Sequence, residues 1–163
     1  MSITVRCCVR RSGLRIAGVR ADARRMLAAL GETGADLAVS LVDDREIHRL
    51  NRAYRDADRP TDVLAFAMRE GPRVPGDHTL LGDVVISVDT AARQARSRAV
   101  PIAEEVRTLL IHGVLHLLGY DHERSAAEAR RMRARERAVR AALETAPRAA
   151  RLRSPDARLE TAR

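Results

Sequence analysis

The sequence predicts an α+β fold, close to the α/β class, in which a small mixed sheet of four strands packs with about five helices. Three observations support this prediction. Short segments rich in Val, Ile and Leu alternate along the chain with longer segments whose apolar residues recur at helical spacing. Stretches that contain Gly and Pro separate several of these segments. The length of 163 residues is sufficient for one domain with its own hydrophobic core.

The first half of the chain is expected to begin with a strand over residues 3–10, a helix over 18–30 and a second strand over 35–42. Asp43 then stands where it can cap the N-terminus of a second helix, because Glu46 follows three residues later in the capping-box pattern. Strands and helices therefore alternate in this half.

The second half is expected to supply two more strands, over residues 63–68 and 80–88, on either side of a Gly- and Pro-rich loop at 69–79. Two helices follow, over residues 89–99 and 102–118. The second of these is apolar on nearly every face, which is typical of a buried, central helix.

The C-terminal part is expected to form one more helix and a tail. Ser125 and Glu128 form a capping box for an arginine-rich helix that reaches about Leu143. Residues 1–145 are therefore predicted to be a single domain, and residues 146–163 a basic, disordered tail.

The positive charge is concentrated in this C-terminal part. The chain has a net charge of +8, and every basic residue is Arg. From residue 124 onward 12 Arg stand against 5 acidic residues, whereas residues 1–123 carry 18 Arg against 17. Such a basic region suits a polyanion such as RNA. A solubilising arginine-rich helix with a frayed end is an equally good interpretation.

Two features bear on the cellular compartment. The sequence has no run of 18 consecutive apolar residues, so no membrane span is expected, and its N-terminus lacks the apolar region of a signal peptide. The two cysteines, Cys7 and Cys8, are neighbours, which is poor geometry for a structural disulfide between them. These features favour a reducing cytoplasm.

The segment HGVLHLLGYDH, residues 112–122, predicts a metal centre. His112 and His116 are four residues apart on an apolar helix, so they project from the same side. Gly119 lets the chain turn back, and His122 can then return to the same point. Buried imidazoles need polar partners, and one divalent metal ion satisfies all three. Such a site suits zinc, although copper, nickel or iron could also bind.

Three protein ligands leave the fourth tetrahedral position of zinc for water, as in catalytic sites. His78 and Asp83 are distant candidates for a fourth ligand, which would indicate a structural site instead. A non-enzymatic alternative therefore stays open, in which the metal only stabilises the fold.

The histidine spacing also matches the metzincin protease motif HExxHxxGxxH at all but one position. The Glu of that motif is the general base, and here its place is taken by Gly113. This argues against peptide hydrolysis. Because Asp121 or Glu123 could in principle substitute, a metalloprotease remains an alternative.

The stretch LNRAYRDADRPTDVLAF, residues 50–66, is the second candidate site. Arg55 and Arg59 flank two aspartates just ahead of a predicted strand. The plain interpretation is a solvated loop with local salt bridges. The functional interpretation is that Arg55, with Arg59 as a second candidate, binds a phosphate group through the planar fork of its guanidinium.

These stretches carry a resemblance to a known family. HGVLHLLGYDH resembles the H-G-x-L-H-L-x-G-Y-D-H motif of the YbeY-type endoribonucleases, which are bacterial rRNA maturation factors. YRDADRPTDVLAF is similar to the second motif of that family, Y-R-x-K-D-x-P-T-D-V-L-S-F, and LLGDVVIS to its L-G-D-I-x-I-S strand. The resemblance covers residues 35–143, and this chain departs from the second motif at Ala57 and Ala65.

The resemblance implies a metal-dependent endoribonuclease that favours single-stranded RNA and acts in 16S rRNA maturation and ribosome quality control. It implies one zinc ion per chain in an open cleft, with His112, His116 and His122 as ligands. Arg55 would be the catalytic or RNA-contacting arginine. The implied partners are rRNA, the small ribosomal subunit and ribosome-associated proteins, with no membrane.

Overall fold

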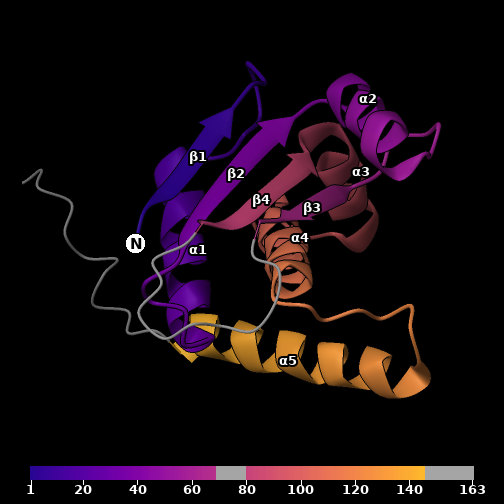
Figure 1. Ribbon diagram of the computed structural model, residues 1–163. Coiled ribbons are helices and arrows are strands. Elements are labelled where there is room, and N and C mark those ends of the chain that lie inside the picture. The colour runs from indigo at the N-terminus through magenta and orange to yellow at the C-terminus, as the bar shows by residue number, and fades with distance from the viewer. Residues whose placement is uncertain (69–79, 146–163) are drawn as a thin grey trace, which may run out of the picture.

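Four strands form one mixed sheet in the computed structural model, which describes residues 1–68 and 80–145 (Figure 1). The strands are β1 (Ile3–Cys7), β2 (Asp36–Val42), β3 (Val63–Ala67) and β4 (Leu80–Ser87), in the order β1-β2-β4-β3. β2 pairs in parallel with β1 and β4, whereas β3 pairs antiparallel to β4 at the edge. The expected α+β fold with a small mixed sheet is confirmed.

Five helices accompany the sheet in the described residues. They are α1 (Ile16–Ala29), α2 (Asp44–Arg55), α3 (Val88–Arg98), α4 (Ile102–Leu117) and α5 (Ala126–Thr145). All nine elements lie where the sequence predicted them, with shifts of a few residues at their ends. The predicted loop at 69–79 and the predicted tail at 146–163 lie outside the described residues. No helix of the described part is long and apolar enough to cross a membrane.

The hydrophobic core lies mainly on one face of the sheet. Alternate residues of β2 and β4, such as Val39 and Val84, point into a large cluster that also contains buried residues of α1, α3, α4 and α5. A smaller cluster of Val42, Ile47, Leu64 and Val85 lies on the other face. It forms because α2 covers only the β3–β4 end of that face (Figure 1). α2 contacts α3 of the opposite face where β4 ends, because Asp44 accepts from Ser87 and Thr90.

The central helix α4 is buried on almost all sides, as its composition predicted. Its C-terminus is closed by two backbone hydrogen bonds: Gly119 donates to the His116 carbonyl, and Tyr120 donates to the Leu115 carbonyl. Gly119 adopts a φ of 94°, which a residue with a side chain rarely accepts. This Schellman arrangement ends the helix and reverses the chain immediately after His116.

The end of β1 and the start of α1 are two of the places where the structure differs from the predictions. β1 ends at Cys7 rather than at residue 10, because its partner β2 ends at Val42 and Asp43 already caps α2. Cys8 still donates to the Leu41 carbonyl at 2.9 Å, and beyond Cys8 a strand would have no neighbour to pair with. α1 begins at Ile16, two residues earlier than expected. The structure accommodates Gly18 inside that helix.

Candidate metal centre

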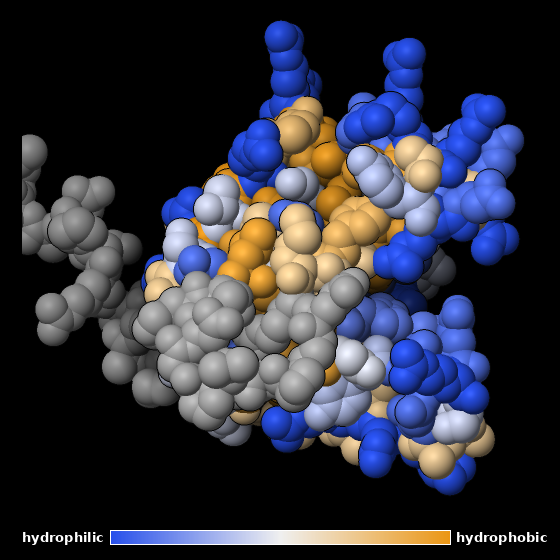
Figure 2. All heavy atoms as spheres, in the orientation of Figure 1, coloured by the Kyte–Doolittle hydropathy of each residue, from blue (hydrophilic) through white to orange (hydrophobic). Residues whose placement is uncertain are grey.

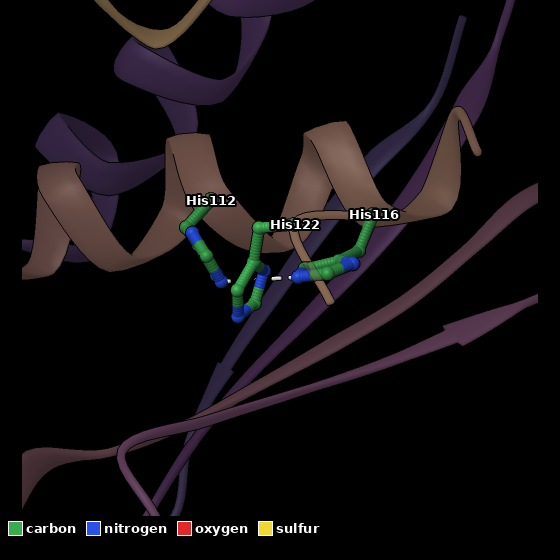
Figure 3. A group of neighbouring side chains, drawn as sticks. All are labelled: His112, His116 and His122. Atoms are coloured by element: carbon green, nitrogen blue, oxygen red, sulfur yellow. Dashed lines mark hydrogen bonds between the residues drawn. The ribbon is translucent and has the colours of Figure 1, made fainter. Parts of the chain in front are cut away.

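Three imidazoles converge under the C-terminal half of α4 (Figure 3). His112 and His116 project from the helix, and His122 comes from the chain that returns after Gly119. Their potential ligand nitrogens all lie within 4.8 Å of one another. The predicted convergence of the three histidines is therefore confirmed.

The donor set fits a tetrahedral metal ion. The Nε2 atoms of His112 and His116 are 3.0 Å apart. Two nitrogens bound to one tetrahedral zinc ion at about 2.0–2.1 Å would be separated by about 3.3 Å, so only a small adjustment is needed. The three rings are half-buried or exposed, which leaves an approach from solvent.

Burial lowers the pKa of His116, and the neighbouring charges of His112 and His122 lower it further. At neutral pH this imidazole is therefore uncharged. The neutral form is the one that coordinates metals, so His116 can bind a metal ion without first losing a proton.

Nothing in the described part of the chain adds a fourth protein ligand to this group, which contains the three histidines alone. Asp83, a candidate from the sequence, lies in β4 and is not a member. His78 lies outside the described residues. Among the described residues the centre is therefore of the three-ligand type, with room for a water molecule or a substrate oxygen.

A carboxylate from a distant helix contacts the group, and the sequence analysis missed it. The Nδ1 atom of His112 donates to Oε1 of Glu136 in α5 at 2.9 Å, across a separation of 24 residues. The only local signal for this residue is that it is the one acid among six arginines between residues 129 and 143.

Gly113 faces the sheet rather than the metal centre. A Cβ atom at this position would lie 2.7 Å from Cγ1 of Val84 and 3.3 Å from Cγ2 of Val63. No side chain fits there without displacing the sheet. Gly113 occupies the position that holds the general base in metzincin proteases. Besides lacking a carboxylate, this position has no room for a side chain.

Arg55 is the last residue of α2 and reaches the edge strand β3. Its Nη2 atom donates to the Ala65 carbonyl at 2.6 Å, and its guanidinium lies 5.6 Å from the centre of the Phe66 ring. No described contact joins Arg55 to any of the three histidines. The strand it touches does pack against α4, since Val63 of β3 lies next to Gly113.

Arg59 lies in the loop between α2 and β3, and its described contacts are made by its backbone. The buried side chain of Asn51 donates to the Arg59 carbonyl at 2.9 Å. Asp62 accepts from its own neighbour Val63 and from Gln94 of α3. These hydrogen bonds of the polar stretch hold the loop in place.

Comparison with known proteins is consistent with this geometry. Residues 16–144 match the model of the family described as Endoribonuclease YbeY. A protein named Endoribonuclease YbeY from Geobacter metallireducens is 50% identical over 127 residues, which cover 77% of this chain and 85% of that protein. The protein of the same name from Aquifex aeolicus is 50% identical over 113 residues, covering 69% of this chain and 73% of its own length.

A solved structure has a similar fold. The solution structure of a protein from Thermotoga maritima superimposes with a TM-score of 0.53 and 26% sequence identity. The match covers 96% of this chain and 99% of that one.

Proposed function

The chain belongs to the endoribonuclease YbeY family, and from this premise we propose that it hydrolyses RNA phosphodiester bonds at a metal centre held by His112, His116 and His122. The observation that carries the proposal is the convergence of three ligand nitrogens within 4.8 Å beside a glycine that excludes a protease-type base. Relatives that match over most of the chain bear the name endoribonuclease.

One zinc ion per chain is the cofactor we propose. The three neutral imidazoles would bring no charge of their own, so the full charge of the ion would act on an anionic substrate. A bound zinc ion would supply Lewis-acid stabilisation of the phosphate and make a water molecule more acidic. An RNA phosphodiester needs such positive charge more than it needs a strong base, which is consistent with Gly113 in place of a glutamate.

Arg55 is proposed to assist catalysis by binding a phosphate oxygen of the RNA, and Arg59 to contact the substrate beside it. The bond to the Ala65 carbonyl and the stack on Phe66 hold the guanidinium of Arg55 in one orientation. Only one of its five N–H donors is used in that bond, so the others can serve a phosphate.

The biological setting is proposed from the family resemblance. We propose that residues 1–145 form a single ribonuclease domain that acts in the cytoplasm on single-stranded segments of 16S rRNA, in maturation and quality control of the small ribosomal subunit. The net charge of +8 favours association with RNA. Ribosome-associated proteins are further proposed partners.

The main alternative is a ribosome assembly factor in which the metal serves only the fold. A structural zinc site normally has four protein ligands, and the described residues supply three. The metalloprotease alternative is weakened further by the packing of Gly113 against Val84.

Cleavage of a structured rRNA fragment by wild-type protein and by His116→Ala, purified identically, tests the proposal. We expect wild type to cleave and to contain about one zinc ion per chain, and the variant to lose both properties because a ligand is missing. His48→Ala is the matched control, since this exposed histidine of α2 lies outside the metal group.

Equal cleavage by wild type and His116→Ala would indicate a contaminating nuclease and contradict the proposal. Zinc bound by wild type without any cleavage, on free rRNA or on ribosomal subunits, would favour the assembly factor.

A further inference from the structure

Glu136 is an isolated acid in a strongly basic helix. Between residues 129 and 143 of α5 it is the only acidic residue, among six arginines. On such a helix the expected partners of a glutamate are arginines three or four residues away. Arg133 and Arg140 occupy those positions.

The structure gives Glu136 a different partner. Its Oε1 atom accepts from Nδ1 of His112 at 2.9 Å, and both side chains are about two-thirds buried, with 31% and 32% of their surfaces exposed. Arg140 instead donates to Thr108 of α4. No ion pair in the described residues joins Glu136 to an arginine. The carboxylate is therefore directed to the metal centre even though arginines are closer along the chain.

This contact determines which nitrogen of His112 can bind a metal. A carboxylate only accepts hydrogen bonds, so Nδ1 of His112 must carry the proton. The lone pair then lies on Nε2, the atom that faces Nε2 of His116 at 3.0 Å. The ring is thus fixed in the tautomer and the orientation that the metal centre requires.

We propose that Glu136 is a positioning residue for the metal centre, which holds His112 in its metal-binding tautomer and orientation. Carboxylates that accept from metal-bound histidines have this role in other metalloproteins, where they contribute about 10–100-fold to metal affinity. The inference rests on the proposed function, because it takes the three histidines to be metal ligands.

Among the described residues, His112 is the ligand that a carboxylate supports, whereas His116 has a hydrogen bond to the Tyr120 backbone. In the described residues the carboxylate paired with His122 belongs to Glu123, at 3.9 Å from Nε2, and its side chain is 83% exposed. That distance is beyond a hydrogen bond. Through its bond to His112, Glu136 also connects the arginine-rich helix α5 to the metal centre.

The affinity for zinc, measured by competition with a chromophoric chelator, tests the inference. We expect Glu136→Ala to bind zinc about 10–100-fold more weakly than wild type. Glu136→Gln keeps an acceptor oxygen but lacks the charge, so its loss should be smaller. Glu144→Gln, which neutralises an exposed acid two turns further along the same helix, should bind zinc as wild type does.

A second measurement separates positioning from a general effect on folding. In the zinc-loaded wild type, ¹⁵N chemical shifts of the ring should show His112 protonated at Nδ1 and metal-bound through Nε2. Thermal unfolding of the zinc-free proteins controls for stability, since Glu136→Gln is nearly isosteric and should unfold close to wild type.

The outcomes are distinguishable. Zinc binding by Glu136→Ala within twofold of wild type, or coordination of His112 through Nδ1, would overturn the inference while leaving the proposed function intact. A wild-type protein that binds no zinc would contradict the proposed metal centre itself, and this inference with it.

Discussion

At Gly113, α4 approaches the sheet closely. A methyl group at this position would sit 2.7 Å from Cγ1 of Val84, well inside normal contact distance. Gly113→Ala should therefore destabilise the protein by about 1–3 kcal/mol through overpacking, despite the better helix propensity of Ala. Urea denaturation of the zinc-free protein would measure this loss.

The control for this prediction is the same substitution where space is available. Gly18 lies inside α1, and a Cβ atom there would meet its nearest neighbour, Cβ of Arg15, at 3.8 Å. Gly18→Ala should stabilise the protein by about 0.4–1 kcal/mol because it restricts the unfolded chain. If both variants shift stability in the same direction, the tight approach of α4 to Val84 is not energetically important.

Arg55 is the residue whose proposed role can be separated from metal binding. Its described contacts are on β3 and not on the histidines, so Arg55→Ala should keep its zinc. If the guanidinium stabilises charge on the phosphate, cleavage should fall by about 100-fold or more. Zinc content and the rate of RNA cleavage would be measured on the same preparation.

Arg52→Ala is the control for Arg55, because Arg52 lies one turn earlier on the exposed side of α2. Arg55→Lys adds a stricter comparison, since lysine keeps the charge but lacks the planar fork. Cleavage by Arg55→Ala at a rate near that of wild type would exclude the assisting role.

At the level of secondary structure, Asp44 joins the starts of two helices. Its Oδ1 atom accepts from the hydroxyls of Ser87 and Thr90 at 2.6 Å each, and its Oδ2 atom accepts from Arg93 at 2.8 Å. These bonds tie the N-terminus of α2 to β4 and α3. Partial burial raises the pKa of Asp44, but the hydroxyl bonds and the arginine outweigh it and hold the pKa below 3.8.

This lowered pKa predicts how the stability depends on pH. A group whose pKa is depressed on folding stabilises the native state above its unfolded pKa, and the contribution disappears as the pH falls through the folded value. Asp44→Asn should therefore cost about 1–3 kcal/mol at pH 7, and the cost should shrink below about pH 4. Denaturation of both proteins across this range would test it. A cost that is constant down to pH 2, or a similar pH-dependent cost for Glu144→Gln, would contradict this role.

The helices and strands could be predicted because their signals are local. Asp43 illustrates this, since its side chain accepts from the Glu46 backbone at 2.9 Å as the capping pattern indicated. The bonds from Asp44 to Ser87 and Thr90 span 43 and 46 residues, and no pattern within one helix reveals them. Local spacing alone does not predict burial, because Tyr54 lies two turns after the buried Ile47 in α2 and yet is 69% exposed.

At the scale of the whole molecule, the metal centre likewise combines residues that are close in the sequence with residues that are distant. The three histidines fall within eleven residues on a helix and its turn, so their convergence followed from spacing. Glu136 approaches from another helix, and Gly113 is closed by strands that precede it by many residues. Those contacts depend on how α4 packs between the sheet and α5. The spacing of residues along the chain does not reveal this packing.

Acidic and basic side chains of α5 differ in how far they are exposed to solvent. Glu128 and Glu136 of α5 are half-buried, whereas Arg130, Arg131 and Arg135 are exposed. Hydrophilic side chains accordingly gather over α5 and over α2, with apolar ones over the strands between them (Figure 2). Of the three acids of α5 only Glu144, near its C-terminus, is exposed, so most of the outward face of the helix is basic, and such a surface attracts a polyanion.

This distribution predicts that α5 contributes to RNA binding. Arg131 and Arg135 line a groove together with Tyr120 and Asp121, the residues that lead into His122. Removing one arginine that neutralises a phosphate of single-stranded RNA should reduce the slope of log affinity against log salt by about 0.7. The double variant Arg131→Gln/Arg135→Gln should therefore lower that slope by about 1.4 without changing zinc content. RNA binding would be measured between low and moderate salt.

Two comparisons decide whether α5 itself is responsible. Arg20→Gln/Arg24→Gln removes the same charge at the same spacing from α1 and controls for net charge. Truncation after Thr145 removes residues 146–163 and tests their share separately. If α5 binds the backbone, its double variant lowers the slope more than the α1 pair does. If the two double variants lower the slope equally, the arginines act only through net charge. If truncation alone lowers the slope, the RNA contacts lie in residues 146–163 rather than on the helix.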